Sequence, residues 1–107
     1  MSDFREYFNH IRAELTELEN VEIGRMMSSE GITYKTKVFA FYYKDSMVFK
    51  LGKSFEPESL GLSNWAWLNP FKNKPPLKAW FVIPGEYENR WHELAHLALE
   101  NIKKELG

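Results

Sequence analysis

The first segment of the chain, residues 3–18, repeats apolar side chains every three or four positions. These side chains are Phe4, Tyr7, Phe8, Ile11, Leu15 and Leu18. Such spacing predicts an amphipathic helix with one buried stripe and a polar outer face. Ser2 or Asp3 can cap this helix, and Glu6 is placed to complete a capping box. We therefore expect a helix that docks onto the rest of the domain through its apolar stripe.

The pattern changes between Val21 and Leu51 to β-branched and aromatic residues, with short polar interruptions at 28–31, 34–36 and 44–46. Runs of this kind are typical of an antiparallel β-meander. Gly31 lies inside an otherwise strand-like stretch, which favours a bulge over a full turn at that point. The sequence therefore predicts three long strands in this segment.

The strand predicted from Lys37 to Tyr43 has no clearly polar face. Simple alternation places Phe39, Phe41 and Tyr43 on one face and Val38, Ala40 and Tyr42 on the other. Helices can cover one of these faces, and a partner chain could cover the second. A homodimer would meet that need, because a bare face of Val38, Ala40, Tyr42 and Val48 would be prone to aggregation.

The last third of the chain contains one further strand and a long helix. A short helical turn is expected at Glu56–Leu60, and Leu77–Ile83 resembles a strand that Pro84 and Gly85 end. From Glu86 to Leu106 one helical face carries Trp91, Leu94, Ala95, Ala98, Leu99, Ile102 and Leu106. The predicted fold is α+β, with an N-terminal helix, an antiparallel β-meander, a further strand or two, and a long C-terminal helix packed on the sheet.

Composition narrows the class of protein. With 107 residues, 44% of them hydrophobic, the chain fits one domain spanning 1–107. The absence of cysteine excludes disulfides, thiolate zinc sites and a cysteine nucleophile. Neither a signal-peptide pattern nor an apolar run long enough for a membrane span occurs, so we expect a cytoplasmic protein without membrane contact.

The sequence HELAH at residues 92–96 matches the zinc metalloprotease motif and lies on the predicted C-terminal helix. His92 and His96, one helical turn apart, could share a zinc ion, and Glu93 could activate a bound water. A third ligand is expected downstream of the second histidine, and nothing suitable follows there. His10 could approach from the first helix, but we do not expect a metal, a cofactor or enzymatic activity.

A second candidate site combines aromatic and basic side chains, as in proteins that stack single-stranded nucleic acid. It comprises Trp65, Trp67, Lys72, Lys74 and Lys78. The net charge of −1 is not that of a typical nucleic-acid-binding domain, although residues 31–80 have an excess of basic side chains. Nucleic acid is therefore an alternative partner, and core packing by the tryptophans is the favoured explanation.

Several short runs resemble the N-terminal domain of TfoX/Sxy proteins. These are Gly24-Arg25-Met26-Met27, Gly31-Ile32-Thr33-Tyr34, residues 37–41 and residues 47–51. The resemblance spans nearly the whole chain, although Met27-Ser28-Ser29 stands where the family has F-G-G. It implies a non-enzymatic regulatory role, which in full-length competence regulators involves a second, helical domain and control of transcription for DNA uptake.

We therefore expect a protein-interaction domain whose partner is a protein of unknown identity. The residues expected near the partner surface are Arg25, Met26, Tyr34, Lys35, Tyr42 and Lys50. Direct nucleic-acid binding through residues 65–80 and zinc-dependent hydrolysis through HELAH are the two alternative hypotheses.

Overall fold

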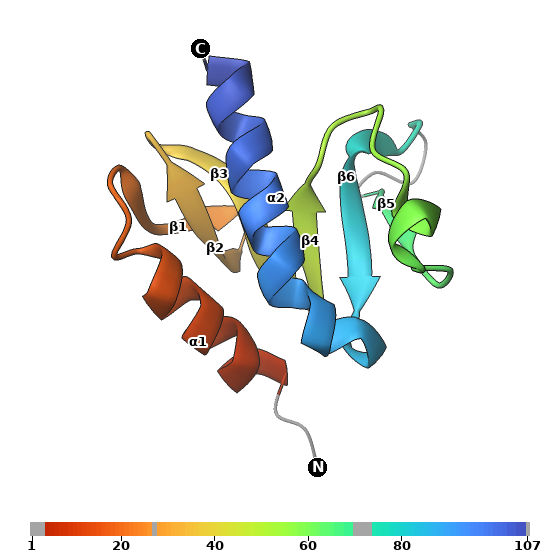
Figure 1. Cartoon of the computed structure of the whole chain (residues 1–107), viewed down its shortest axis with the longest axis horizontal. Coiled ribbons are helices and arrows are strands. Elements are labelled where there is room, and N and C mark those ends of the chain that lie inside the picture. The colour runs from red at the N-terminus through yellow and green to blue at the C-terminus, as the bar shows by residue number, and fades with distance from the viewer. Residues whose placement is uncertain (1–3, 27, 70–73, 107) are drawn as a thin grey trace.

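The computed structural model describes residues 4–26, 28–69 and 74–106 and has two helices on one face of a sheet (Figure 1). Helix α1 spans Phe4–Leu15, and helix α2 spans Glu88–Leu106. The strands are β1 (Val21–Met26), β2 (Ser29–Tyr34), β3 (Lys37–Tyr43), β4 (Ser46–Lys50), β5 (Ala66–Leu68) and β6 (Leu77–Pro84). Short 3₁₀ helices lie at η1 (Pro57–Leu60) and η2 (Gly85–Tyr87). The predicted α+β class is confirmed.

The six strands form one antiparallel sheet in the order β1-β2-β3-β4-β6-β5. Strands β1 to β4 are a meander, and β6 adds beside β4 before β5 closes the other edge. The prediction of three strands between Val21 and Leu51 is wrong, because the chain reverses between the paired residues Met26 and Ser29. Gly31 lies within β2, opposite Gly24 of β1.

Two tight turns connect the central strands. Lys35 and Thr36 between β2 and β3, and Lys44 and Asp45 between β3 and β4, all have positive φ, from 47° to 71°. Two successive residues with positive φ are typical of the type I′ turn, whose twist matches that of the strands it joins. These turns fix the register of the meander without glycine.

An extra residue in β3 changes which side chains face the helices. Ile32 pairs with Ala40 and the next residue, Thr33, pairs with Val38, so Phe39 is a β-bulge. Phe39 and Ala40 both join the core under the helices, whereas Phe41 belongs to a cluster on the opposite face. The predicted simple alternation, with Phe39, Phe41 and Tyr43 together, is therefore wrong.

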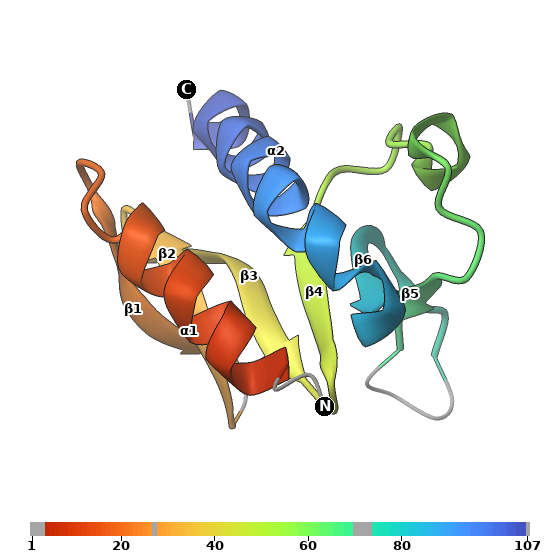
Figure 2. The same cartoon turned by 60° about the horizontal axis from the view of Figure 1, so that its bottom comes forward.

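The main core lies between the sheet and the two helices, which run side by side in both views (Figures 1 and 2). Helix α1 contributes Phe8, Ile11 and Leu15, and α2 contributes Trp91, Leu94, Ala95, Ala98, Leu99 and Ile102. These residues confirm both predicted apolar stripes, except that Leu18 and Leu106 at their ends are exposed. The cap expected from Ser2 or Asp3 lies outside the described residues.

The second face of the sheet, here called the far face, has a smaller apolar cluster of its own. Its buried members are Phe41, Val48 and Leu68, and Met26, Val38, Leu77, Trp80 and Val82 pack around them. The premise of the homodimer prediction is therefore wrong, since Ala40 and Val48 are fully buried within one chain. Neither helix of the described part of the chain is long and apolar enough to cross a membrane.

Candidate metal site and far-face hollow

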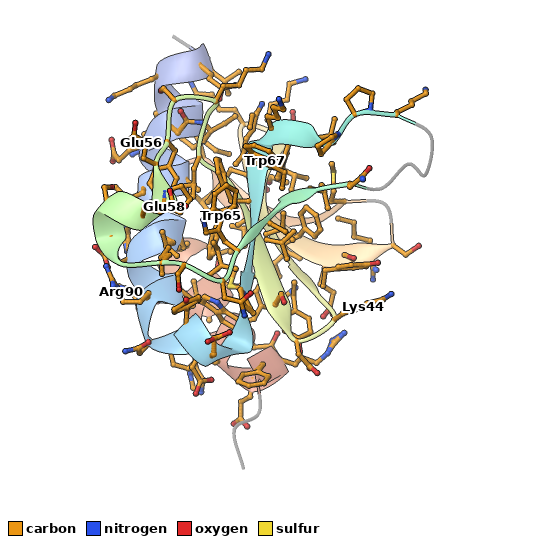
Figure 3. The ribbon with its side chains drawn as sticks, turned by 90° about the vertical axis from the view of Figure 1, so that its right-hand side faces the viewer. Lys44, Glu56, Glu58, Trp65, Trp67 and Arg90 are labelled. Atoms are coloured by element: carbon orange, nitrogen blue, oxygen red, sulfur yellow. The ribbon has the colours of Figure 1, made fainter. Side chains whose placement is uncertain are left out.

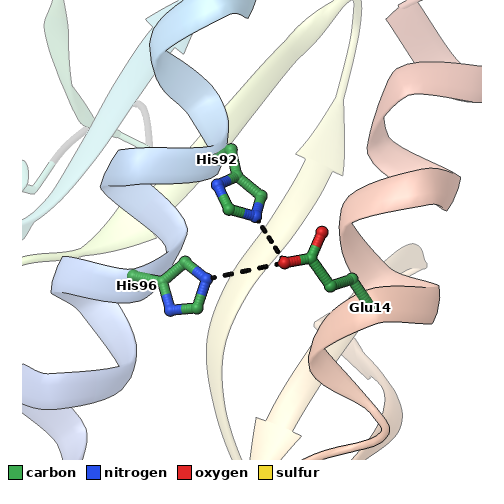
Figure 4. A group of neighbouring side chains, drawn as sticks. All are labelled: Glu14, His92 and His96. Carbon is green, nitrogen blue, oxygen red and sulfur yellow. Dashed lines mark hydrogen bonds and ion pairs between the residues drawn. The ribbon is translucent and has the colours of Figure 1, made fainter.

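A carboxylate from α1 and two imidazoles from α2 converge on the outer surface of the helix layer (Figure 4). His92 and His96 are one helical turn apart, so their side chains leave the same side of α2. Glu14 lies one residue before buried Leu15, at the margin of the stripe that α1 packs inward. Because Tyr7 packs edge-on against Trp91, the two helices are held close enough for the three polar side chains to meet.

The distances place all three side chains within reach of one another. The Nε2 atom of His92 is 2.7 Å from Oε1 of Glu14, and the Nε2 atom of His96 is 4.0 Å from the same oxygen. The two imidazole rings meet edge to face with centroids 4.7 Å apart. One potential ligand atom from each residue lies within 4.8 Å of the others.

The electrostatics of the group agree with this geometry. The hydrogen bond with His92 lowers the pKa of the Glu14 carboxyl below its ordinary value; burial partly opposes this shift, and the charges of His92 and His96 act in the same direction as the hydrogen bond. Since a carboxylate only accepts hydrogen bonds, Nε2 of His92 donates in this pair.

Glu93, the central residue of the HELAH sequence, is engaged elsewhere. Its carboxylate accepts a hydrogen bond of 2.8 Å from Nε of Arg90, and Nη1 of Arg90 donates to the Leu60 carbonyl at η1. Figure 3 shows Arg90 on the side of α2 that faces η1. Glu93 is not part of the group formed by Glu14, His92 and His96.

No suitable third ligand was expected downstream of His96, and none of the described residues there joins this group. On the first helix the sequence pointed to His10, but the residue that approaches is Glu14, one helical turn after it. His10 is exposed and not part of the group. One feature of the sequence could have pointed to Glu14 as a ligand. It flanks the apolar stripe through which the first helix was expected to dock onto the rest of the domain.

A hollow of about 460 Å³ opens on the far face of the sheet. Its apolar walls are formed by Phe41, Tyr43, Trp67, Leu68 and Val82, from β3, β5 and β6. Ser28, Ser29 and Asn69 supply polar groups. Tyr43 is 39% exposed, so its ring remains accessible to another molecule in the hollow. The far-face hollow lies across the sheet from the group formed by Glu14, His92 and His96.

Two lysines lie over exposed aromatic rings, and one of these rings belongs to the hollow. The ammonium nitrogen of Lys44 is 5.2 Å from the centre of the Tyr43 ring in the hollow, and that of Lys78 is 5.1 Å from the centre of the Trp67 ring. Cations at such distances are attracted by the ring faces. Among the described residues, no charged side chain lines the hollow itself, so Lys44 is the cation placed beside its accessible ring.

The six residues expected near a partner surface are divided between the two faces of the sheet. Tyr34 and Tyr42 pack against the main core on the helix side, whereas Met26 packs against the far-face cluster. Arg25 on β1 and Lys35 in a turn are exposed. Lys50 forms an ion pair of 2.9 Å with Glu105 of α2. Of these residues, Met26 is the one that the structure places in the far-face cluster.

The tryptophan–lysine group is also divided. Trp65 is half-buried against Phe81, and its indole N–H donates to Glu58 at 2.8 Å. Figure 3 labels Trp65, Glu58 and Trp67. The Trp67 ring lies beside that of Trp65 with centroids 5.4 Å apart, Lys78 lies over it, and Lys74 is exposed. Lys72 lies outside the described residues. Trp65 therefore contributes to the core, while Trp67 remains available for contact.

Comparison of the chain with protein-family models, with curated proteins and with solved structures finds no match in any of the three.

Proposed function

We infer that this domain binds a protein partner and is not an enzyme, as its resemblance to the N-terminal domain of TfoX/Sxy regulators suggests. The single observation that carries this proposal is the far-face hollow, with its apolar walls and accessible Tyr43 ring. Aromatic residues in a concave apolar site are typical anchors of protein interfaces. A regulatory role in transcription follows from the resemblance alone.

The rim of the hollow favours a particular kind of partner. Lys44 lies over the Tyr43 ring at 5.2 Å, and no carboxylate lines the hollow among the described residues. A peptide segment with an apolar anchor and a nearby acidic side chain would fill the hollow and pair with Lys44. Complementary charge of this kind raises association rates and favours the correct partner.

A non-enzymatic role is also supported by the state of the HELAH sequence. In zinc hydrolases the glutamate of this motif acts as a general base on metal-bound water. Here the Glu93 carboxylate is held by Arg90, and the far-face hollow lies on the other side of the sheet from His92 and His96. In the described part of the chain, the glutamate of the motif and the far-face hollow are both separate from the two histidines, an arrangement that supports a non-enzymatic role.

Site-specific photo-cross-linking in the native host tests the partner surface. A photoreactive phenylalanine analogue replaces Tyr43 at the hollow or, as a control, Leu97, which is 40% exposed on α2. We expect one protein to be captured from position 43 and not from position 97. The purified partner should then bind Tyr43→Ala and Lys44→Glu variants at least about tenfold more weakly than the unaltered domain.

The controls for this binding measurement are Leu97→Ala and Lys104→Glu, both at exposed positions of α2. Unchanged affinity for these variants is expected. Capture of the same proteins from positions 43 and 97 would refute the proposed surface. Titration with a single-stranded oligonucleotide tests the nucleic-acid hypothesis. Tight, salt-sensitive quenching of tryptophan fluorescence, together with no captured protein, would favour nucleic acid as the partner.

A further inference from the structure

We propose that Glu14, His92 and His96 form a binding site for one divalent transition-metal ion, with zinc as the best-matched ion. The site is independent of the proposed partner surface, which lies across the sheet. Two imidazole nitrogens and one carboxylate oxygen are a ligand set that zinc uses in proteins. The three side chains already present these atoms to one another.

The distances fit a metal site after small side-chain rotations. Zinc binds nitrogen and carboxylate oxygen at about 2.0–2.2 Å, so two ligand atoms of a tetrahedral ion lie about 3.4 Å apart. The two distances from Oε1 of Glu14 to the histidine Nε2 atoms, 2.7 and 4.0 Å, lie on either side of that separation. Glu14 would withdraw slightly from His92 and approach His96.

The exposure of the site permits this rearrangement. The side chains of His92 and His96 are each 44% exposed, and that of Glu14 is 58% exposed, so no core packing opposes their rotation. The same exposure leaves room for a water molecule as the fourth ligand. In the absence of metal, the hydrogen bond between Glu14 and His92 holds two of the three ligands close together.

The bound ion would have a structural role. Its ligands are 78 positions apart in the sequence, on the first and the last helix of the domain. Because the three ligands come together only in the folded chain, binding would stabilise the folded state. The ion would thus fix α1 against α2, while Glu93 remains bound to Arg90 and takes no part.

The first test is calorimetric titration of the untagged, chelator-treated full chain with zinc chloride. We expect saturable binding of one zinc ion per chain. The variants His92→Ala, His96→Ala and Glu14→Gln should each weaken binding at least about tenfold. His10→Ala and Glu93→Gln are matched controls, since they alter the third histidine and a neighbouring carboxylate outside the group, and both should bind zinc as the unaltered chain does.

Thermal unfolding provides a second readout that does not depend on the heat of binding. At a hundredfold excess over Kd, zinc should raise the Tm of the unaltered chain by at least about 5 °C. The Tm of the Glu14→Gln and His92→Ala variants should not respond to zinc. Absence of saturable binding, equal affinity in Glu14→Gln, or loss of binding in His10→Ala would each overturn the proposed three-residue site.

Discussion

The close pairing of β1 with β2 predicts a strong energetic coupling between Gly24 and Thr33. A Cβ atom added at Gly24 would lie 2.3 Å from Cγ2 of Thr33, but 3.6 Å from its Cβ and 3.8 Å from its Oγ1. Favourable contacts between carbon atoms occur near 3.5–4.0 Å. The conflict therefore comes from a single methyl group, which serine lacks.

The expected magnitude follows from the two opposing effects of Gly24→Ala. Overpacking a buried site costs about 1–3 kcal/mol, whereas replacing glycine within a strand contributes about 0.5–1 kcal/mol of stability. Thr33 cannot turn its methyl group away freely, because its hydroxyl donates to the Glu22 carbonyl at 3.2 Å and its side chain is buried. Gly24→Ala should thus destabilise the unaltered chain by about 1–2 kcal/mol.

The same substitution should be neutral or stabilising when Thr33 is serine. Thr33→Ser alone should cost about 1 kcal/mol for the lost methyl group, and Gly24→Ala in that background should restore about 0.5 kcal/mol. The coupling energy of the double-mutant cycle is then about 2 kcal/mol. Urea unfolding followed by tryptophan fluorescence measures all four free energies of unfolding.

Gly31→Ala is the control for this cycle. Its added Cβ would lie 2.9 Å from the Ala40 carbonyl oxygen, which belongs to the main chain and cannot be removed by substitution. Gly31→Ala should therefore destabilise the chain equally with threonine or serine at position 33. If Gly24→Ala costs the same in both backgrounds, the contact between Gly24 and Thr33 does not limit the pairing of β1 and β2.

Two further predictions concern the β2–β3 turn and Tyr87, the last residue of η2. Replacing Lys35 by Asn together with Thr36 by Gly should stabilise the chain by about 1–2 kcal/mol in urea unfolding, because both residues have positive φ in a type I′ turn; a lower stability would contradict the assigned turn. Tyr87 should ionise at lower pH than Tyr42, because hydrogen bonds with the Ser63 hydroxyl and the backbone N–H groups of Asn64 and Ser63 lower the pKa of Tyr87, whereas burial raises the pKa of Tyr42. The folded pKa of Tyr87 lies below the unfolded value, so the stabilisation is complete above the unfolded pKa and is lost as pH falls through the folded pKa. In phenolate absorbance, Tyr87→Phe should remove a component that titrates at lower pH than the one removed by Tyr42→Phe, and the reverse order would contradict these hydrogen bonds.

Much of the fold could be predicted because its signals are local. Apolar side chains repeat every three or four positions around Phe8 and Ile11, and again around Leu94 and Ala98. This spacing predicts helices that bury one face. The interruption at 28–31 was assigned to a bulge at Gly31 because the reversal itself, between Met26 and Ser29, contains none of the glycine, asparagine or aspartate that usually marks a tight turn. The bulge at Phe39 was also missed, since a strand that is apolar on both faces shows no break in alternation.

The candidate metal site shows a different limit of sequence reasoning. The spacing of His92 and His96 is local and was recognised, but Glu14 belongs to a helix that reaches them only through tertiary packing. No linear motif connects residues 78 positions apart. The division of the predicted partner residues between two faces has the same origin, because the bulge at Phe39 placed Tyr42 beneath α1, where its ring stacks on Phe8.

The extra residue at Phe39 also determines where β3 can tolerate a change in length. Removing Phe39 would join Val38 directly to Ala40 and restore regular alternation, so every other side chain of the strand would keep its present face. The cost would be the loss of the Phe39 ring from the main core. Removing Phe41 instead would turn one end of the strand over, exchanging helix-side and far-face positions. Single-residue deletions within this strand should therefore be accepted first at position 39, and natural variation in its length is expected to be concentrated there.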